Sequence, residues 1–489
     1  MSGGNGRLNV ALVEILRDEK ISSTVRLKKA KYLIALGADV KANVAGKSVL
    51  SWVLKDDNTA IEVIDFLKEN GAKEFEISET EANELAQGFW GENGKLKSME
   101  EIKSLVIRGA NLGMYNKNTD KQIWKDLSLE EINEILKILP RGYEIGGNVI
   151  LRGRGLEKLP DFSKVIVYGH FDCNGNELTT LEGAPEKVGK DFVCSENKLT
   201  TLNGVPKEVG RDFDCCDNEL TSLRGAPEKV MSFLCAGNHL KTLEGAPKEV
   251  IWKFDCNGNE IISLRGAPKE VGGKFDCSGN ELTTLEGAPE KVGEDFVCSE
   301  NKLTTLKGAP QRVGGGFDCH CNQLLTLEGS SREVESCFVC SDNQLISLKG
   351  APEKVGGVGF YCENNKLTTL EWLPEIVEGD LDCSYNQLTS LKGAPDKVEG
   401  SFRCKSNKLT TLEYGPEKVG GDFNCSNNKL RSLEGGPSTV GSNFKCSGNK
   451  LTSLKGKPRE IGRRFVIEKD VLAKIKENDV ILYGGKEGR

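Results

Sequence analysis

Cysteine is the residue whose number and spacing first suggest chemistry in this chain. The 489 residues include 17 cysteines. Thiolates ligate metal ions and act as nucleophiles, and pairs of thiols form disulfides. Regularly spaced cysteines therefore raise the question of a metal-binding or redox protein. Fourteen of them form a ladder with a step of 20 to 22 residues: Cys173, Cys194, Cys215, Cys235, Cys256, Cys277, Cys298, Cys319, Cys340, Cys362, Cys383, Cys404, Cys425 and Cys446.

The neighbours of each ladder cysteine indicate where its thiol must lie. An aromatic residue or leucine stands two positions earlier, as Phe275 does before Cys277. Side chains two apart on a strand point to the same side, so the pattern predicts a short strand with both residues facing the core. A buried thiol behaves as a small apolar group and is inert unless its pKa is lowered. We therefore predict a ladder that packs the core, with no metal or cofactor, and no disulfides between adjacent rungs in a reducing compartment.

The rest of each rung predicts a turn and an extended return segment. Asn280 stands three residues after Cys277, where its amide can satisfy backbone groups at the end of the strand. Leu282 and Leu285 follow at five and eight residues after the cysteine. Pro289, in a Gly-x-Pro sequence, fixes an extended segment because proline locks φ. Stacked copies of this unit would place the asparagines in one hydrogen-bonded row.

This order of residues resembles the leucine-rich repeats. The stretch 280–292, NELTTLEGAPEKV, has the spacing of the short bacterial type of about 21 residues, with cysteine in place of a strand leucine. The resemblance extends from Val149 to about Ile475 and implies a repeat solenoid, a horseshoe with a parallel β-sheet on its concave face. Bacterial repeats of this type are sometimes joined to a ubiquitin-ligase domain with a nucleophilic cysteine. No cysteine lies outside 173–446, so we expect no such activity.

The amino-terminal part has a different, helical periodicity. The segments 29–43 and 61–74 each show an apolar helical face followed by Gly-Ala, and Gly37 and Gly71 are 34 residues apart. This part is similar to the ankyrin repeats, with a degenerate third copy at 102–112. The similarity implies an all-α domain before the solenoid.

A further helix is predicted between these two parts. Ser128 and Glu131 form the pattern of a capping box, and Pro140 would end the helix. Its apolar face would consist of Leu129, Ile132, Ile135, Leu136 and Leu139. We expect this helix to cover the open first end of the solenoid.

The predicted organisation therefore has four parts. They are ankyrin-like helical repeats at 1–127, a capping helix and linker at 128–147, a solenoid at 148–475 and a C-terminal edge strand and tail at 476–489. Within the solenoid, the cysteine rungs span 171–464, between capping repeats at 149–159 and 465–475. The edge strand is expected in DVILY, 479–483.

The remaining reactive residues form no convincing site. Cys216, Cys321 and Cys337 lie outside the ladder, and Cys319, His320 and Cys321 are consecutive. That spacing matches no established zinc pattern, so surface thiols are the favoured interpretation. The three histidines fall in distant rungs, which argues against a histidine-based triad. We expect no enzymatic activity, because no acid, base and nucleophile cluster.

Charge and hydropathy narrow the class of partner. The chain has 66 basic and 73 acidic residues and a net charge of −7, which argues against nucleic acid as a partner. The first 20 residues lack the pattern of an export signal, and no stretch predicts a membrane span. We expect a cytoplasmic protein, with delivery into a host cell by a signal-independent route left open. Its oligomeric state is left open as well.

The predicted concave face is the candidate binding surface. In each strand, the residue between the aromatic residue and the cysteine must face outward. The candidate partner-binding residues are Asp172, Asp214, Asp255, Asp276, Asp318, Tyr361, Asp382 and Arg403. One interpretation is a solvated face in which aspartate and valine alternate. The other is an acidic trough, turning basic toward Lys445, that steers a basic protein segment. Calcium bound by the aspartates is a lesser alternative, because no calcium-loop spacing occurs.

These features predict a non-enzymatic scaffold for protein–protein interaction, with a basic segment of its partner on the acidic concave face. Repeats of both kinds mostly bind proteins, so this function rests on the two resemblances. The alternative is a structural or assembly element that stacks or oligomerises without a specific ligand.

Overall fold

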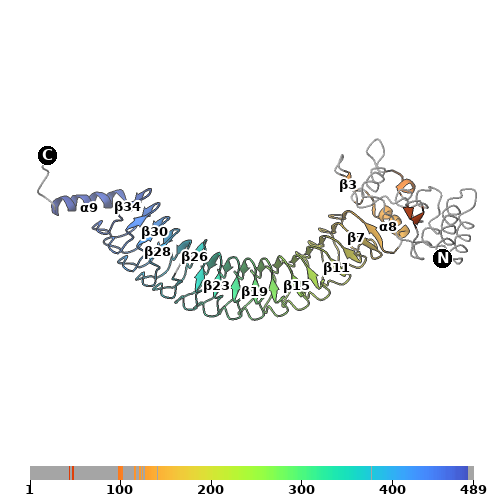
Figure 1. Cartoon of the computed structure of the whole chain (residues 1–489), viewed down its shortest axis with the longest axis horizontal. Coiled ribbons are helices and arrows are strands. Elements are labelled where there is room, and N and C mark those ends of the chain that lie inside the picture. Colours follow the sequence, from red (N-terminus) through yellow and green to blue (C-terminus); the bar gives the residue numbers. More distant parts are fainter. Residues whose placement is uncertain are drawn as a thin grey trace, which may run out of the picture. The chain divides into compact units, whose positions relative to one another are not determined.

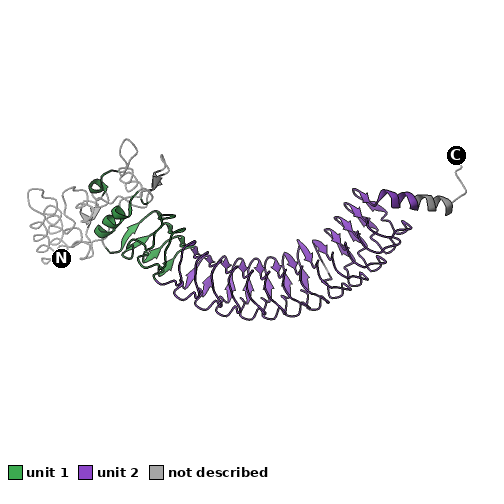
Figure 2. Cartoon of the chain, turned by 180° about the vertical axis from the view of Figure 1, so that it is seen from behind, with its two compact units in different colours: residues 1–194, 204–211 green, residues 195–203, 212–489 purple. Residues whose placement is uncertain are grey.

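The structure of the protein is a computed structural model, shown in Figure 1. It describes the backbone of 43–44, 47–48, 97–102, 115–116, 121–122, 124, 127–139, 141–375 and 377–482. Side chains are described for 97–102, 124, 127–139, 141–375 and 377–475. The chain divides into two compact units, 1–194 with 204–211 (unit 1) and 195–203 with 212–489 (unit 2), coloured in Figure 2.

The predicted ankyrin-like repeats lie almost entirely outside the described residues. Within 1–127 the described backbone includes two short antiparallel pairs. Strand β1 (Asn43–Val44) pairs with β2 (Lys47–Ser48), and β3 (Tyr115–Asn116) pairs with β4 (Lys121–Gln122).

Unit 1 contains the predicted capping helix. Helix α8 (Leu129–Ile138) begins with the expected capping box, in which the Ser128 hydroxyl accepts from the Glu131 N–H and the Glu131 carboxylate accepts from the Ser128 N–H. Ile132 and Ile135 are buried, whereas Leu129 is 40% exposed and does not join the apolar face. Arg154, at the place of the turn asparagine, donates to the carbonyls of Trp124 and Leu127. This contact joins the segment just before the helix to the first repeat.

Unit 1 also contains the first repeats, which pair in two parallel sheets. Strands β6 (Val149–Ile150), β8 (Phe171–Asp172) and β10 (Phe192–Val193) form one ladder. Strands β5 (Tyr143–Ile145), β7 (Val165–Val167), β9 (Lys187–Val188) and β11 (Glu208–Val209) form the other. Val149 aligns with Phe171, so the predicted first capping repeat continues the frame.

Unit 2 contains the longer solenoid, whose first sheet carries the aromatic residues and cysteines. We call it the Phe–Cys sheet. All its neighbouring strands are parallel and in register, with Phe beside Phe as in Phe254↔Phe275↔Phe296. Leu381 takes the place of Phe in one strand. Its strands are β12 (Phe213–Asp214), β14 (Phe233–Leu234), β16 (Phe254–Asp255), β18 (Phe275–Asp276), β20 (Phe296–Val297), β22 (Phe317–Asp318), β24 (Cys337–Val339), β26 (Gly359–Tyr361), β27 (Asp380–Asp382), β29 (Phe402–Arg403), β31 (Phe423–Asn424), β33 (Phe444–Lys445) and β35 (Phe465–Val466).

A second parallel sheet, the valine sheet, lies three to five residues earlier in each repeat, and four in most. This sheet has two parts. Val377 joins them, because it forms one isolated β-bridge with Val355 and another with Val398. The first part comprises β13 (Lys229–Val230), β15 (Glu249–Val250), β17 (Glu270–Val271), β19 (Lys291–Val292), β21 (Arg312–Val313), β23 (Glu333–Val334) and β25 (Lys354–Val355). The second comprises β28 (Lys397–Val398), β30 (Lys418–Val419), β32 (Thr439–Val440) and β34 (Glu460–Ile461).

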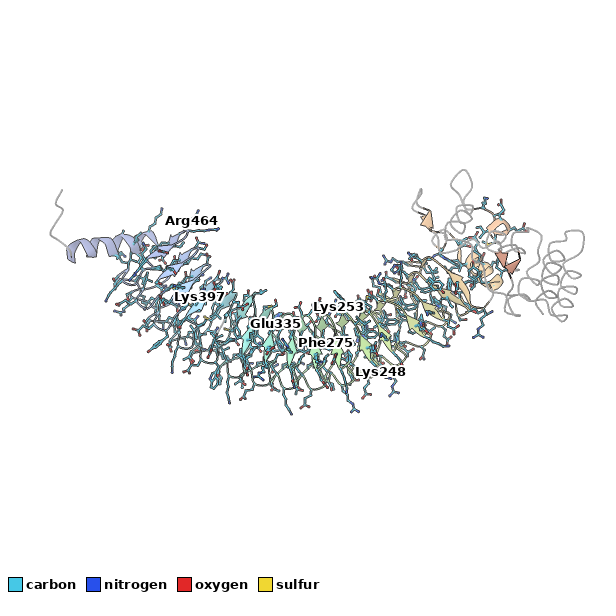
Figure 3. The ribbon with its side chains drawn as sticks, in the orientation of Figure 1. Lys248, Lys253, Phe275, Glu335, Lys397 and Arg464 are labelled. Carbon is cyan, nitrogen blue, oxygen red and sulfur yellow. The ribbon has the colours of Figure 1, made fainter. Side chains whose placement is uncertain are left out.

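Unit 2 by itself is a curved array of these repeats, a parallel-sheet solenoid of the leucine-rich-repeat type (purple in Figure 2). In Figure 3, Lys253, one residue before β16, lies toward the inside of the arc, and Lys248, one residue before β15, lies on the outside. Each strand is very short, so stability must come from stacking between repeats rather than from any one strand.

Stacked apolar side chains fill the interior of each repeat. Phe275 and Cys277 are fully buried, as are Leu282 and Leu285 after the turn. The phenyl rings of neighbouring strands stack, with centroids 5.2 Å apart for Phe254 and Phe275. These contacts confirm the predicted inward pair of aromatic residue and cysteine.

The asparagine row is also present and is fully hydrogen-bonded. In Asn280, Oδ1 accepts from the Ile261 N–H of the preceding repeat at 2.9 Å. Its Nδ2 donates to the carbonyls of Cys277 and, one repeat earlier, Cys256, both at 3.1 Å. One side chain therefore closes its own turn and joins two repeats, which confirms the role predicted for this residue.

The carboxyl end of the solenoid differs from the prediction. Strand β35 pairs with β33 and continues the sheet, but helix α9 (Lys469–Leu482) follows it. The edge strand predicted over 479–483 is wrong for Asp479 to Leu482, and Tyr483 lies outside the described residues. Leu472 and Ile475 are spaced for one face of a helix, and Ile475 is 1% exposed. These residues belong to a terminal helix rather than to a last capping repeat.

Candidate functional site

The exposed side of the Phe–Cys sheet, which we call the strand face, carries the predicted binding residues. The residue between Phe and Cys aligns from strand to strand, for example Asp255↔Asp276, Tyr361↔Asp382 and Asp382↔Arg403. Seven of the eight candidates lie in this row of unit 2: Asp214, Asp255, Asp276, Asp318, Tyr361, Asp382 and Arg403. The eighth, Asp172, occupies the equivalent place in unit 1.

Each aspartate of this row first serves its own turn. The Oδ1 atom of Asp276 accepts from the backbone N–H of Ser278 at 3.1 Å and from its hydroxyl at 2.6 Å. The same bond to the N–H two residues later is made by Asp172, Asp214, Asp255, Asp318 and Asp382. Asn424 makes it as well, at 3.1 Å. This local turn explains why aspartate or asparagine recurs here without reference to any ligand.

Asp255 and Asp276 are also neutralised by lysines on their own strands. The Lys253 Nζ lies 2.8 Å from Asp255 Oδ2, and the Lys274 Nζ lies 2.9 Å from Asp276 Oδ2. The two carboxylates are adjacent in register, and their side chains are only 11% and 10% exposed. The lysines offset the repulsion between these neighbours, so this part of the row offers little free negative charge.

The basic end of the row is paired in the same way. Arg403 Nη1 lies 2.8 Å from Asp380 Oδ2, and Lys445 Nζ lies 2.6 Å from Asp422 Oδ2. Burial alone would raise the pKa of Asp422, but the hydrogen bonds from Lys445 and Asn443 hold that pKa well below its usual range. The predicted gradient from acidic to basic is therefore largely compensated by acids at the start of each strand.

The middle of the strand face is different, because its acids form no direct ion pair with Lys or Arg, although the charge of Arg403 reaches Asp382 and Glu363. Among the described residues, neither Asp382 nor Glu363 forms an ion pair, and Asp318 has only the His320 Nδ1, at 2.8 Å. The Glu363 Oε2 atom is buried with no hydrogen-bond partner. Burial raises the pKa of Glu363, and the nearby charge of Asp382 adds to the effect. We call Asp318, Tyr361, Glu363 and Asp382 the acidic centre.

Tyr361 provides the aromatic part of the acidic centre. It lies in register with Asp382 on the next strand. Its hydroxyl donates to the Val358 carbonyl at 3.2 Å, and burial raises the pKa of the phenol. A half-buried tyrosine beside unpaired acids offers both a flat apolar contact and a cation-binding face.

Glu363 was missed by the sequence analysis. It directly follows ladder residue Cys362, at a place where the two neighbouring rungs have Ser341 and Ser384. Both serines are buried. The replacement of a buried small residue by a carboxylate in one rung was the signal that would have found it.

The ladder cysteines behave as predicted for core residues. All of them are free and buried. Their thiols donate to carbonyls of the next strand, as Cys277 Sγ does to the Val297 oxygen at 3.3 Å. Burial raises the pKa of Cys277 well above its usual value and that of Cys446 to about 12. A thiol held in this protonated form is a poor nucleophile and metal ligand.

The cysteines outside the ladder are more accessible but do not form a metal site. Cys321 is exposed, and Cys216 and Cys337 are half-buried. Burial raises the pKa of Cys321 and of Cys337. Within the described part of the chain, no group of three or more His, Cys, Asp or Glu side chains is placed to hold a metal ion.

The described helices include none that combines the length and the apolar character needed to cross a membrane.

The chain was also compared with known proteins. No family model matches it, and no curated protein matches it. Among solved structures it is similar to YopM, a leucine-rich effector protein from Yersinia pestis, with 20% identity, coverage of 65% of this chain and 88% of that one, and a TM-score of 0.46. It is similar to the functional domain of InlJ from Listeria monocytogenes, which includes a cysteine ladder, with 19% identity, coverage of 61% and 70%, and a TM-score of 0.40. The leucine-rich repeat domain of APL1B is similar with 14% identity, coverage of 68% and 86%, and a TM-score of 0.36.

Proposed function

We propose that the solenoid is a protein-binding scaffold and that the strand face binds a basic segment of a partner protein at the acidic centre. The observation that carries this proposal is the contrast along one row. Asp255 and Asp276 have lysine partners, whereas Glu363 and Asp382 form no ion pair with any described residue. Arg403, in register with Asp382, forms its ion pair with Asp380 and acts on the two carboxylates only through its longer-range charge.

A bound lysine or arginine would supply what the acidic centre lacks. A buried carboxylate oxygen without a hydrogen bond is costly, because it has lost its hydrogen bonds to water and has formed none with the protein. A charge-assisted hydrogen bond from a partner would recover about 1.5–3 kcal/mol. The Tyr361 ring, beside Asp382 in register, adds a face on which a guanidinium can stack.

The architecture supports an extended partner. In a parallel solenoid each repeat contributes one position to the same surface, about 5 Å from the next. From Asp318 in β22 to Asp382 in β27 the acidic centre spans neighbouring strands of one sheet. A segment lying across the strands would meet Asp318, Tyr361 and Asp382 in turn.

Affinity capture from a cell lysate, read by mass spectrometry, tests this proposal. The test variant combines Asp318→Asn, Glu363→Gln and Asp382→Asn, which removes charge and retains an acceptor oxygen. Asn424 already makes the same turn as the aspartates, so the test variant should fold. We expect a basic protein to be retained by the wild type, lost from the test variant and released as salt rises from about 0.05 to 0.5 M.

The matched control is the double variant Asp255→Asn, Asp276→Asn, whose acids already have lysine partners. It should retain the same protein. Equal capture by the test variant would contradict the role of the acidic centre. If neither wild type nor variants retain any specific protein, and the wild type instead forms oligomers that depend on its concentration, the chain is a structural assembly element.

A further inference from the structure

Two exposed aromatic residues occupy a backbone position where the other repeats of unit 2 have glycine. This position lies ten residues after each ladder cysteine, as Gly287 does after Cys277, and its backbone is in the left-handed region. Trp372 has φ 79° and Tyr414 has φ 67°. The glycines at this position, with φ between 81° and 98°, are Gly225, Gly245, Gly266, Gly287, Gly308, Gly329, Gly350, Gly393, Gly435 and Gly456.

Neither the backbone nor the core explains these two substitutions. A side chain with a Cβ is disfavoured in the left-handed region, most of all a bulky one. Burial would compensate for this, but Trp372 is 62% exposed and Tyr414 is 67% exposed. A strained, solvent-exposed aromatic residue that the fold does not require indicates a binding role.

Two hollows share Leu373, Pro374 and Glu375 in their linings, and Trp372 lines the first of them. The first, of about 590 Å³, is lined by Trp372 together with Pro352, Val355 and Glu378. The second, of about 650 Å³, is lined by Val377, Gly393, Pro395 and Asp396. Gly393 belongs to the repeat between those of Trp372 and Tyr414, so the second hollow lies over that repeat.

The charges around these hollows are predominantly acidic. The nearby lysines already have carboxylate partners: Lys392 Nζ lies 2.7 Å from Glu371 Oε1, and Lys397 pairs with Glu399. The exposed acids Glu375, Glu378 and Asp396 form no ion pair with any described residue. A ligand of this surface must therefore satisfy aromatic faces and unpaired carboxylates together.

We propose that Trp372, Tyr414 and the two hollows form a second docking surface, for an extended arginine- or lysine-bearing segment of another protein. This second surface goes beyond the proposed function, because neither Trp372 nor Tyr414 nor the lining of the hollows belongs to the strand face. Trp372 and Tyr414 are two repeats apart, about 10 Å at sheet spacing. In a polyproline II segment, residues three apart share a face and are separated by about 9 Å. Two cationic side chains at that spacing can each lie over one aromatic ring, near the free carboxylates.

The probe that fits this geometry is a fluorescent peptide of tandem Arg-Pro-Pro units, with tandem Glu-Pro-Pro as the charge control. Binding is measured by fluorescence anisotropy. We expect the full-length protein to bind the arginine peptide and not the glutamate peptide. The double variant Trp372→Gly, Tyr414→Gly restores the residue of the other repeats and should weaken binding by about tenfold or more.

Two controls separate this surface from the others. Trp252 is another exposed tryptophan of unit 2, 56% exposed, at a place where the next repeat has Gly273, so Trp252→Gly should leave binding unchanged. The triple variant of the acidic centre should also bind the arginine peptide normally, whatever its effect on lysate capture.

The proposal fails if the wild type does not bind the arginine peptide, or binds both peptides alike. It also fails if Trp252→Gly weakens binding as much as the double variant does, or if the double variant unfolds at a lower temperature than the wild type. That last result would mean that the aromatic residues stabilise the fold. If sedimentation shows self-association that only the double variant loses, the occupant is a second copy of the chain, and the proposal is overturned as well.

Discussion

The repeats from β16 to β20 and those from β26 to Tyr414 have the same backbone arrangement. They differ in whether their polar side chains have partners and in the residue at the left-handed position. In the first region, Asp276 serves its turn and pairs with a lysine, and Gly287 occupies the left-handed position. In the second, Glu363 has a buried oxygen without a hydrogen bond, and Trp372 and Tyr414 replace the glycine.

Regular and irregular rungs therefore have different roles in this molecule. Repetition serves stability, since each rung is held by equivalent residues of its neighbours. A rung that departs from the pattern at a cost in stability has been kept for another reason. In this molecule the regular rungs explain the fold, and the irregular rungs suggest the binding surfaces.

The largest expected effect breaks the regular frame itself. Asn280→Ala leaves the Ile261 N–H without its side-chain acceptor and removes one of the two asparagine donors to each of the carbonyls of Cys256 and Cys277. We expect a loss of about 3 kcal/mol in the free energy of unfolding, measured in urea. The exposed Asn203 is the matched control, and Asn203→Ala should cost less than about 0.5 kcal/mol. Similar losses for both would contradict the role of the asparagine row.

The next largest effect on stability is expected when the residue at the left-handed position is exchanged between the two regions. Gly287→Trp adds a Cβ that meets the backbone of Leu264 and Arg265 at 2.9 Å. We expect it to destabilise the protein by about 2 kcal/mol. The reverse change, Trp372→Gly, should stabilise it by about 0.5 kcal/mol. Thermal unfolding followed by circular dichroism measures both, and a stabilising Gly287→Trp would refute the comparison.

Two substitutions of Asp276 separate its turn from its ion pair. Asp276→Asn retains the acceptor for the Ser278 N–H and loses only the pairing with Lys274. Because Lys274 is partly exposed, the loss should be about 0.5 kcal/mol. Asp276→Ala loses the turn bonds as well and should cost about 1.5 kcal/mol. Equal costs in urea unfolding would show that the turn bond contributes nothing.

The smallest effect appears only as a dependence on pH. Burial raises the pKa of Glu363 in the folded state. The folded protein therefore binds the proton of this carboxyl group more tightly than the unfolded chain does. Its stability therefore falls as pH rises from the unfolded pKa, about 4.3, through the folded pKa. Glu363→Gln should be more stable than the wild type at pH 7 and equal to it below about pH 4.

Urea unfolding at a series of pH values measures this difference. The same change at the exposed Glu413 is the control, and only Glu363→Gln should show a gain in stability that grows with pH. A gain that is constant across the series would contradict the burial of this carboxylate.

Periodicity predicted the frame of the solenoid well. The inward Phe275 and Cys277, the asparagine row and the Ser128 capping box are all local patterns, and each fixes its own backbone contacts. The predicted edge strand at the end of the array was wrong. A strand there has no following repeat to pair with, and Leu472 and Ile475 have the spacing of one helical face, which favours a helix.

The candidate site was less predictable, because free charge depends on which side chains meet. Lys253 and Asp255 are two residues apart on one strand, so their side chains must lie on the same face. The sequence contains this relation, but the sequence analysis considered only the residues between Phe and Cys and overlooked it. The pair Arg403 and Asp380 joins neighbouring strands and requires the register. The buried oxygen of Glu363 depends on packing that no local pattern specifies.

The asparagine row has a consequence for the history of the gene. The asparagine bonds between rungs join the same two positions in each pair of neighbours, as Asn280 joins Ile261 and Cys256, so a copied rung inserted into the array would find the same donors and acceptors on both sides. Stretches such as FVCSENKLTTL, identical at 192–202 and 296–306, provide sites where unequal crossing-over can add or delete whole rungs. The length of the solenoid can thus change while the hydrogen-bonding pattern of the asparagine row is kept.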